Sequence, residues 1–150
     1  PEGLHVPLQF FGELEGERAQ GIAERLPAAI GAPPACITTV VGGLGQFPPA
    51  GSPRVLYCPL GAGSEAVGAL YARLRDALRP LTGGAGEEPG RAFQPHVTVA
   101  RNKGGFIDLP AARERFAFEI PVQLDRVVLF QSILGRDGAE YRPLATAVFR

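Results

Sequence analysis

The segment FQPHVTVAR, residues 93–101, alternates apolar and polar side chains in the way that a β-strand does. Side chains of an extended strand point alternately to its two faces, so His96 and Thr98 share one face while Val97 and Val99 share the other. One surface of the predicted strand therefore carries a titratable imidazole together with a hydroxyl group.

The other histidine of the chain, His5, lies in a similar segment near the N-terminus. Residues 4–11, LHVPLQFF, alternate well enough to predict a strand that carries His5. Pro7 has no backbone donor, which indicates an edge strand or a strand beside a cleft.

The rest of the chain alternates between predicted strands and helices. A helix is expected over residues 15–26, ending before Pro27, and the Gly/Pro-rich residues 42–53 and 82–91 are expected to form a turn region and a loop. Further helices are expected over 64–78 and 111–116, and further strands over 36–41, 54–60, 118–124, 126–134 and 141–149, with the turn GRDG at 135–138 joining the last two as a hairpin. Strands outnumber helices and mostly connect as hairpins, so the expected class is α+β with largely antiparallel sheets, arranged as two lobes that each contain one histidine strand.

Length and composition point to one ordinary globular domain over residues 1–150. The hydrophobic share is 45%, and no apolar run approaches the roughly 18 residues of a membrane helix, so we expect a soluble protein. Cys36 and Cys58 are too few for a disulfide framework, and no signal sequence is apparent, so a reduced cytoplasmic protein is expected. Because the chain opens at Pro1 without a Met, we also expect that a native N-terminal segment precedes it.

The balance of charged residues excludes a strong net electrostatic field around the protein. Fifteen basic and fifteen acidic residues cancel, which is untypical of a protein that binds duplexes without sequence preference. A small or terminal nucleotide remains a possible ligand, since it needs only a local positive pocket. All basic residues except Lys103 are Arg, whose planar fork suits phosphate, although a biased genome composition would produce the same excess.

The two histidines suit the cleavage of a cyclic phosphodiester. This reaction deprotonates water on one side of phosphorus and protonates a leaving alkoxide on the other, and two imidazoles can perform both transfers near neutral pH. A hydroxyl group and a cation can stabilise the phosphoryl oxygens, and Thr98 and Arg101 are candidates for these roles.

Four segments together resemble a known family: PEGLHVPLQFFGEL, GGLGQFP with PRVLY, FQPHVTVAR, and VVLFQSILGRDGAEYRPL. They are similar to the two-histidine phosphoesterases, whose signature is a pair of His-x-Thr-x motifs, and among these to the RNA 2',3'-cyclic phosphodiesterases, also called 2'-5' RNA ligases. The resemblance covers nearly the whole chain.

This resemblance implies a bilobal fold with a central cleft and one His motif per lobe. It also implies a strand and a helix ahead of the first motif, so we expect the missing native N-terminal segment to contain them. It implies that His5 donates a proton to the leaving oxygen and that His96 accepts one from water. The expected reaction is hydrolysis of an RNA or nucleoside 2',3'-cyclic phosphate to a 2'-phosphomonoester, in RNA processing, with reversible 2'-5' ligation as a further capacity. No cofactor, metal ion, membrane or obligatory protein partner is expected.

The sequence departs from the family pattern at Pro7, which stands where the first motif has Thr. One phosphate contact is therefore expected to be missing. This departure also supports a rival hypothesis, in which the chain is a catalytically impaired module that binds RNA ends or nucleotides.

Other signals are weaker. Gly61-x-Gly63-x-x-Ala66 formally matches a relaxed dinucleotide fingerprint but lacks the following strand and acid, so we interpret it as an ordinary turn before a helix. No cluster of His, Cys, Asp and Glu has metal-ligand spacing. Tyr57 and Phe130 could stack on a base, although their apolar strands favour a role in the core.

Overall fold

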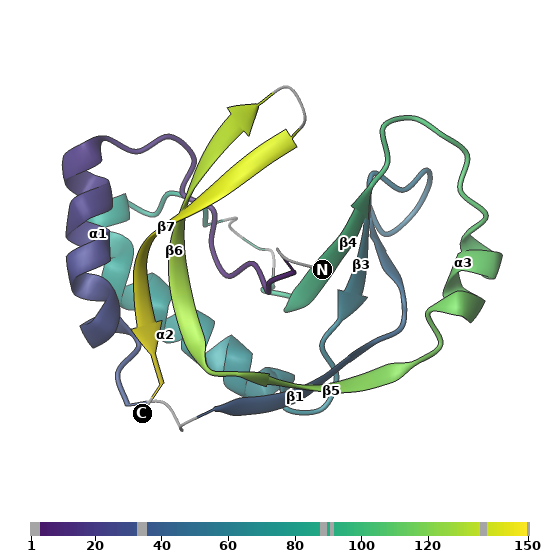
Figure 1. Ribbon diagram of the computed structural model, residues 1–150, viewed down its shortest axis with the longest axis horizontal. Coiled ribbons are helices and arrows are strands. Elements are labelled where there is room, and N and C mark those ends of the chain that lie inside the picture. The colour runs from purple at the N-terminus through teal and green to yellow at the C-terminus, as the bar shows by residue number, and fades with distance from the viewer. Residues whose placement is uncertain (1–3, 33–35, 88–89, 91, 136–137, 150) are drawn as a thin grey trace. The chain divides into compact units, whose positions relative to one another are not determined.

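The computed structural model describes residues 4–32, 36–87, 90, 92–135 and 138–149. Its elements confirm the α+β class and are drawn in Figure 1: α1 (Gly16–Ala29), β1 (Ile37–Gly42), β2 (Gly45–Phe47), β3 (Val55–Pro59), α2 (Ser64–Thr82), β4 (His96–Arg101), α3 (Leu109–Arg115), β5 (Glu119–Leu124), β6 (Arg126–Gly135) and β7 (Gly138–Val148). Within these residues the strands form three small sheets, in the orders β1-β5, β2-β3-β4 and β6-β7. The pairs β2/β3, β3/β4 and β6/β7 are antiparallel, in agreement with the expected sheet type. The pair β6/β7 is the predicted hairpin, and residues 136–137 of its predicted turn lie outside the described residues.

The chain divides into two compact units, each assembled from three separate segments. The first contains residues 1–8, 38–68 and 91–123, and the second contains residues 9–37, 69–90 and 124–150. Both histidines belong to the first unit, so these units do not correspond to the expected lobes with one His motif each.

The sheet β2-β3-β4 forms the centre of the first unit. Its middle strand, β3, buries Leu56, Tyr57 and Cys58. Beyond the end of β4, the side chain of Asn102 donates to the carbonyl oxygens of Pro53 and Gly105 and accepts from the backbone N–H groups of Gly104 and Gly105. These bonds fix the chain directly after Arg101.

In the second unit, α1 packs against β7, and the unit also contains the β6/β7 hairpin and α2 from Ala69 onward. Ile22 and Leu26 lie on the buried face of α1, and Leu74 and Leu78 lie on the buried face of α2. The apolar spacing of both helices in the sequence accounts for these faces.

Two predicted helix ends are wrong, because both helices continue through a proline. Helix α1 runs past Pro27 to Ala29, and α2 runs past Pro80 to Thr82. Each proline stands in the last turn, where it removes only one hydrogen bond. Burial of Ala29 and Thr82 and a hydrogen bond from Arg73 Nη1 to the carbonyl oxygen of Ile30, 2.7 Å long, hold these final turns in place.

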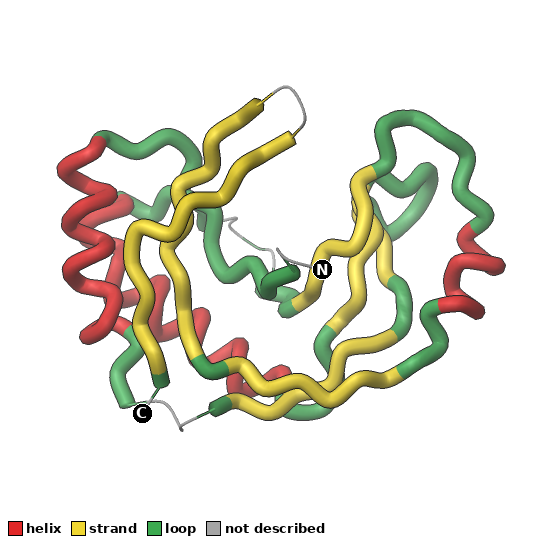
Figure 2. Tube along the Cα trace, viewed as in Figure 1, coloured by secondary structure: helices red, strands yellow, loops and turns green. Residues whose placement is uncertain are grey.

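Two other predictions need correction. Residues 4–11 form no strand, and Figure 2 shows the segment as loop. Pro7 in its centre cannot donate to a sheet, which weakens any strand pairing there. Conversely, the turn region 42–53 contains the short strand β2, because its residues 45–47 pair with β3.

No helix in the described part of the chain combines the length and the apolar character needed to cross a bilayer.

Candidate active site

His96 is the first residue of β4 and pairs with Pro59 on β3. A hydrogen bond of 3.1 Å from the backbone N–H of Leu60 to the carbonyl oxygen of Pro95 continues the ladder beyond this pair. The imidazole is half-buried, so it is held by the sheet yet remains partly accessible.

One hydrogen bond determines the tautomer of His96. Its Nδ1 atom lies 2.7 Å from the carbonyl oxygen of Gln94. A carbonyl oxygen only accepts, so Nδ1 must carry the proton and donate. In the neutral ring Nε2 is then the unprotonated nitrogen, which is the atom that a general base needs.

Thr98 lies on the same face of the sheet as His96, as the alternation predicted. No irregularity separates the pairs Pro59/His96, Cys58/Val97 and Tyr57/Thr98, and directly opposed residues in an antiparallel pair share a face. The half-buried Thr98 hydroxyl group therefore belongs to the surface that carries the imidazole.

Arg101 lies on this face because of an irregularity in the strand pairing. Simple alternation from His96 would place Arg101 on the opposite face, because the two are five residues apart. The register shifts, however, so that Tyr57 opposes Thr98 while Leu56 opposes Ala100, and Val99 is an additional residue in β4. Such a bulge reverses the alternation, and Arg101 comes to lie opposite Val55, on the face of Tyr57 and Thr98.

His5 and Pro7 lie in the loop segment before α1. His5 is exposed and Pro7 is half-buried. The segment belongs to the same compact unit as β4, although 91 positions separate His5 from His96 in the sequence.

The described residues contain no group of three or more His, Cys, Asp or Glu side chains that could hold a metal ion. Of the two thiols, Cys58 lies in β3 beside the site, where burial raises the pKa of its thiol. Among the residues of β2, β3 and β4, the cationic side chain on the face of His96 is that of Arg101, which is exposed.

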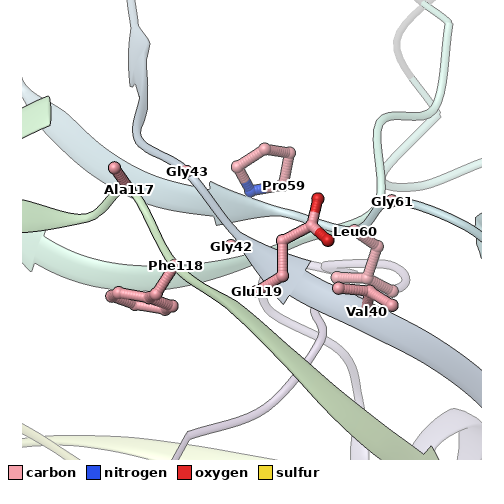
Figure 3. A pocket seen from close by; sticks show the side chains of 9 residues that line it. All are labelled: Val40, Gly42, Gly43, Pro59, Leu60, Gly61, Ala117, Phe118 and Glu119. Atoms are coloured by element: carbon pink, nitrogen blue, oxygen red, sulfur yellow. The ribbon is translucent and has the colours of Figure 1, made fainter. Parts of the chain in front are cut away.

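The first unit also contains an open pocket of about 450 Å³. Its lining includes Pro59, the partner of His96, with backbone from Gly42 and Gly61. In Figure 3 the carboxylate of Glu119 points toward Pro59 and Leu60, whereas the ring of Phe118 points away from them. The pocket contains none of the predicted site residues.

Several contacts of His96 were not expected from the sequence. Phe47 lies edge-on to its ring, and Gln94 accepts its Nδ1 proton. Tyr57 is buried as predicted, yet it also contacts the imidazole. The closely spaced glycines before Phe47 are the one signal in the sequence that could have indicated tight packing there. The core role favoured for Phe130 is wrong, because 41% of that residue is exposed.

Comparisons with known proteins identify the family of this chain. The family model described as the 2'-5' RNA ligase superfamily matches residues 2–136. The RNA 2',3'-cyclic phosphodiesterase of Aeropyrum pernix is 38% identical over 149 residues, which cover 95% of this chain and 80% of that protein.

Solved structures share the fold. The protein TT0787 of Thermus thermophilus superimposes with a TM-score of 0.77 at 28% identity, covering 98% of this chain and 78% of that one. E. coli LigT, crystallised with 3'-AMP, gives a TM-score of 0.72 at 21% identity, with coverages of 99% and 78%. With a family match over most of its length and a sheet that presents His96, Thr98 and Arg101 together, this chain belongs to the 2'-5' RNA ligase superfamily of two-histidine phosphoesterases.

Proposed function

We propose that this chain is an RNA 2',3'-cyclic phosphodiesterase that hydrolyses the cyclic phosphate of RNA ends or nucleotides to a 2'-phosphomonoester without a metal ion. The observation that carries the proposal is the hydrogen bond from His96 Nδ1 to Gln94, which leaves Nε2 as a proton acceptor. The activity named for the Aeropyrum relative and the 3'-AMP bound by E. coli LigT support this substrate class.

In the proposed reaction His96 acts as the base and His5 as the acid. His96 Nε2 takes a proton from water as the water oxygen forms a bond to phosphorus. The bond from phosphorus to the 3'-oxygen breaks, and protonated His5 gives its proton to that leaving oxygen. Both imidazoles then return to their starting states by exchanging protons with solvent.

Thr98 and Arg101 bind the phosphoryl oxygens in this scheme. The Thr98 hydroxyl group can donate one hydrogen bond and the Arg101 guanidinium group two, and both share the face of His96. Their donors stabilise the charge on the phosphoryl oxygens in the transition state.

The same proton transfers allow ligation. If the 5'-hydroxyl of a second RNA replaces water, His96 accepts its proton, and loss of the 3'-oxygen leaves a 2'-5' linkage. Hydrolysis and ligation then differ only in the nucleophile that lies beside His96.

A second candidate function is a catalytically impaired module that binds RNA ends, favoured by Pro7 in place of the family's Thr. The retention of both imidazoles argues against it, because loss of one phosphate donor weakens catalysis less severely than loss of the acid or base. Turnover of a nucleoside 2',3'-cyclic phosphate in the presence of EDTA separates the two functions.

The decisive experiment compares His5→Ala and His96→Ala with the unaltered chain on one cyclic nucleotide, with circular dichroism as the control for folding. Each substitution removes one proton transfer, so each should lower kcat by about 10² to 10⁴. The unaltered chain should give a bell-shaped pH profile, since one imidazole must be protonated and the other neutral. Phosphorus NMR should identify a 2'-phosphate as the product.

Three results would contradict the proposal. Near-normal activity of either His variant would exclude the acid/base pair. A rate that collapses with EDTA and rises continuously with pH would indicate a metal-bound hydroxide. A product that is only 3'-phosphate would mean that the substrate lies reversed between the histidines.

A further inference from the structure

Gln94 is fixed at two points beside His96. Its backbone carbonyl oxygen accepts the hydrogen bond from His96 Nδ1 at 2.7 Å, and its side-chain Nε2 donates to the hydroxyl oxygen of Tyr57 at 3.1 Å. Gln94 itself is exposed and precedes β4, so no strand pairing holds it. The Tyr57 hydroxyl group is thus the side-chain anchor for the residue that sets the His96 tautomer.

The ring of Tyr57 contacts the imidazole as well. The two ring centroids are 5.0 Å apart, and the ring of Phe47 meets the imidazole edge-on at 5.4 Å. Phe47 and Tyr57 are themselves stacked, with centroids 4.4 Å apart and an interplanar angle of 24°. Aromatic pairs at such separations attract one another. The stacked rings thereby restrict the orientations that the imidazole can adopt.

Gly45 makes room for this arrangement. It opposes Tyr57 in the sheet, and a Cβ atom at position 45 would collide with the Tyr57 ring at Cζ. Tyr57 is only 6% exposed, so its ring has little freedom to move away. The glycine therefore lets the ring lie flat over β2, stacked on Phe47 and against His96.

We propose that Tyr57 is a positioning residue for His96: its ring holds the imidazole, and its hydroxyl group, through Gln94, keeps the imidazole proton on Nδ1. The benefit to catalysis rests on the proposed function, in which His96 is the base. The effect on the ring itself does not, because the same contacts would hold the imidazole in a protein with any other activity.

Nitrogen-15 NMR of the imidazoles tests the proposal directly. Since the chain has only two histidines, the spectrum of a His5→Ala variant assigns the signals of His96. We expect neutral His96 to carry its proton on Nδ1. Tyr57→Phe removes the hydroxyl group and retains the ring, and Gln94→Ala removes the anchored side chain and retains the carbonyl. Each should convert His96 into a mixture of the two tautomers.

The two substitutions break the same hydrogen bond, so the double variant should resemble either single variant. In each, kcat on a cyclic nucleotide should fall about three- to tenfold, the range expected for one hydrogen bond, while KM stays unchanged. Gly45→Ala, which displaces the Tyr57 ring, should reduce kcat further. Tyr71→Phe makes the same chemical change on α2 and serves as the matched control, with the His96 tautomer and kcat unaltered.

An unchanged His96 tautomer in both Tyr57→Phe and Gln94→Ala would overturn the proposal. A loss of kcat in Tyr57→Phe without a change of tautomer would also overturn it, since the hydroxyl group would then act on the substrate itself. If instead the tautomer changes as expected while His96→Ala retains activity, Tyr57 positions the ring and the proposed function is the part that fails.

Discussion

Arg101 can serve the site only because β4 contains one additional residue. Val99 interrupts the pairing between Tyr57/Thr98 and Leu56/Ala100, and this bulge turns Arg101 onto the face of His96 and Thr98. A neutral hydroxyl group and a cation thus share the face of β4 on which we propose that phosphate binds. Pro7 can donate no hydrogen bond from its side chain or its backbone, so phosphate binding should depend mainly on the β4 side.

We therefore predict that Thr98→Val and Arg101→Ala each lower kcat/KM on a cyclic nucleotide by about tenfold to more than a hundredfold. This is the range expected when a hydrogen bond to a charged group, worth about 1.5 to 3 kcal/mol, is lost from the transition state. Pro7→Thr supplies the hydroxyl group of the family motif and should leave kcat/KM unchanged or increase it. A silent Thr98→Val together with an inactive Pro7→Thr would mean that the phosphate binds elsewhere.

The sequence predicted part of the site. Alternation alone placed His96 and Thr98 on one face, and the structure confirms it. The bulge at Val99 leaves no signal in the sequence, because Val is an ordinary strand residue on either face. The contacts of Tyr57 and Gln94 with His96 depend on pairing between distant strands, which a local pattern does not encode.

Helix α2 shows that the role of a glycine depends on its position. Gly63, just before the helix, has φ of +84°, and a Cβ atom there would collide with the carbonyl oxygen of Thr38. Gly68 lies inside the helix, with no atom within 4 Å of a Cβ atom built there. The first glycine permits the close approach of two backbones, whereas the second only adds conformational entropy to the unfolded chain.

Substitution of these two glycines should therefore change stability in opposite directions. Gly68→Ala should raise the free energy of unfolding by about 0.5 to 1 kcal/mol, the difference in helix propensity between the two residues. Gly63→Ala should lower it by about 1 to 3 kcal/mol from backbone strain, in addition to the collision with Thr38. Urea denaturation of the two variants checks both signs, and a destabilised Gly68→Ala would show that position 68 is packed more tightly than described.

Elements were easier to predict than their limits. The apolar spacing of α1 and α2 identified both helices. Their C-terminal ends were predicted too early, because burial and hydrogen bonds stabilise a final turn that contains Pro27 in α1 and Pro80 in α2. In contrast, residues 4–11 alternate apolar and polar side chains like a strand but form no strand. Alternation gives a segment one apolar face, but it does not provide a neighbouring strand for pairing.

For the whole molecule, the equal numbers of acidic and basic residues limit how it can attract RNA. A protein with a strongly basic surface contacts many phosphates and releases many counterions, so its affinity falls steeply with salt. This chain has no such excess, and its expected contacts are confined to the terminal cyclic phosphate. Recognition should therefore be local, dominated by Arg101 and the His5 side chain, with few contacts along the remaining RNA.

The salt dependence of kcat/KM measures this directly. For single strands log K changes by about −0.7 per phosphate contact for each unit of log salt concentration, so one or two contacts give a slope of roughly −0.7 to −1.4. We predict that slope for a short oligonucleotide with a 2',3'-cyclic phosphate. For Arg101→Ala the magnitude of the slope should be smaller by about 0.7, because one phosphate contact is lost. Arg18→Ala removes an equal charge from the exposed surface of α1 and should leave the slope unchanged. A slope steeper than about −4 would require several further phosphate contacts, and the substrate would then be bound along its backbone and not at its end alone.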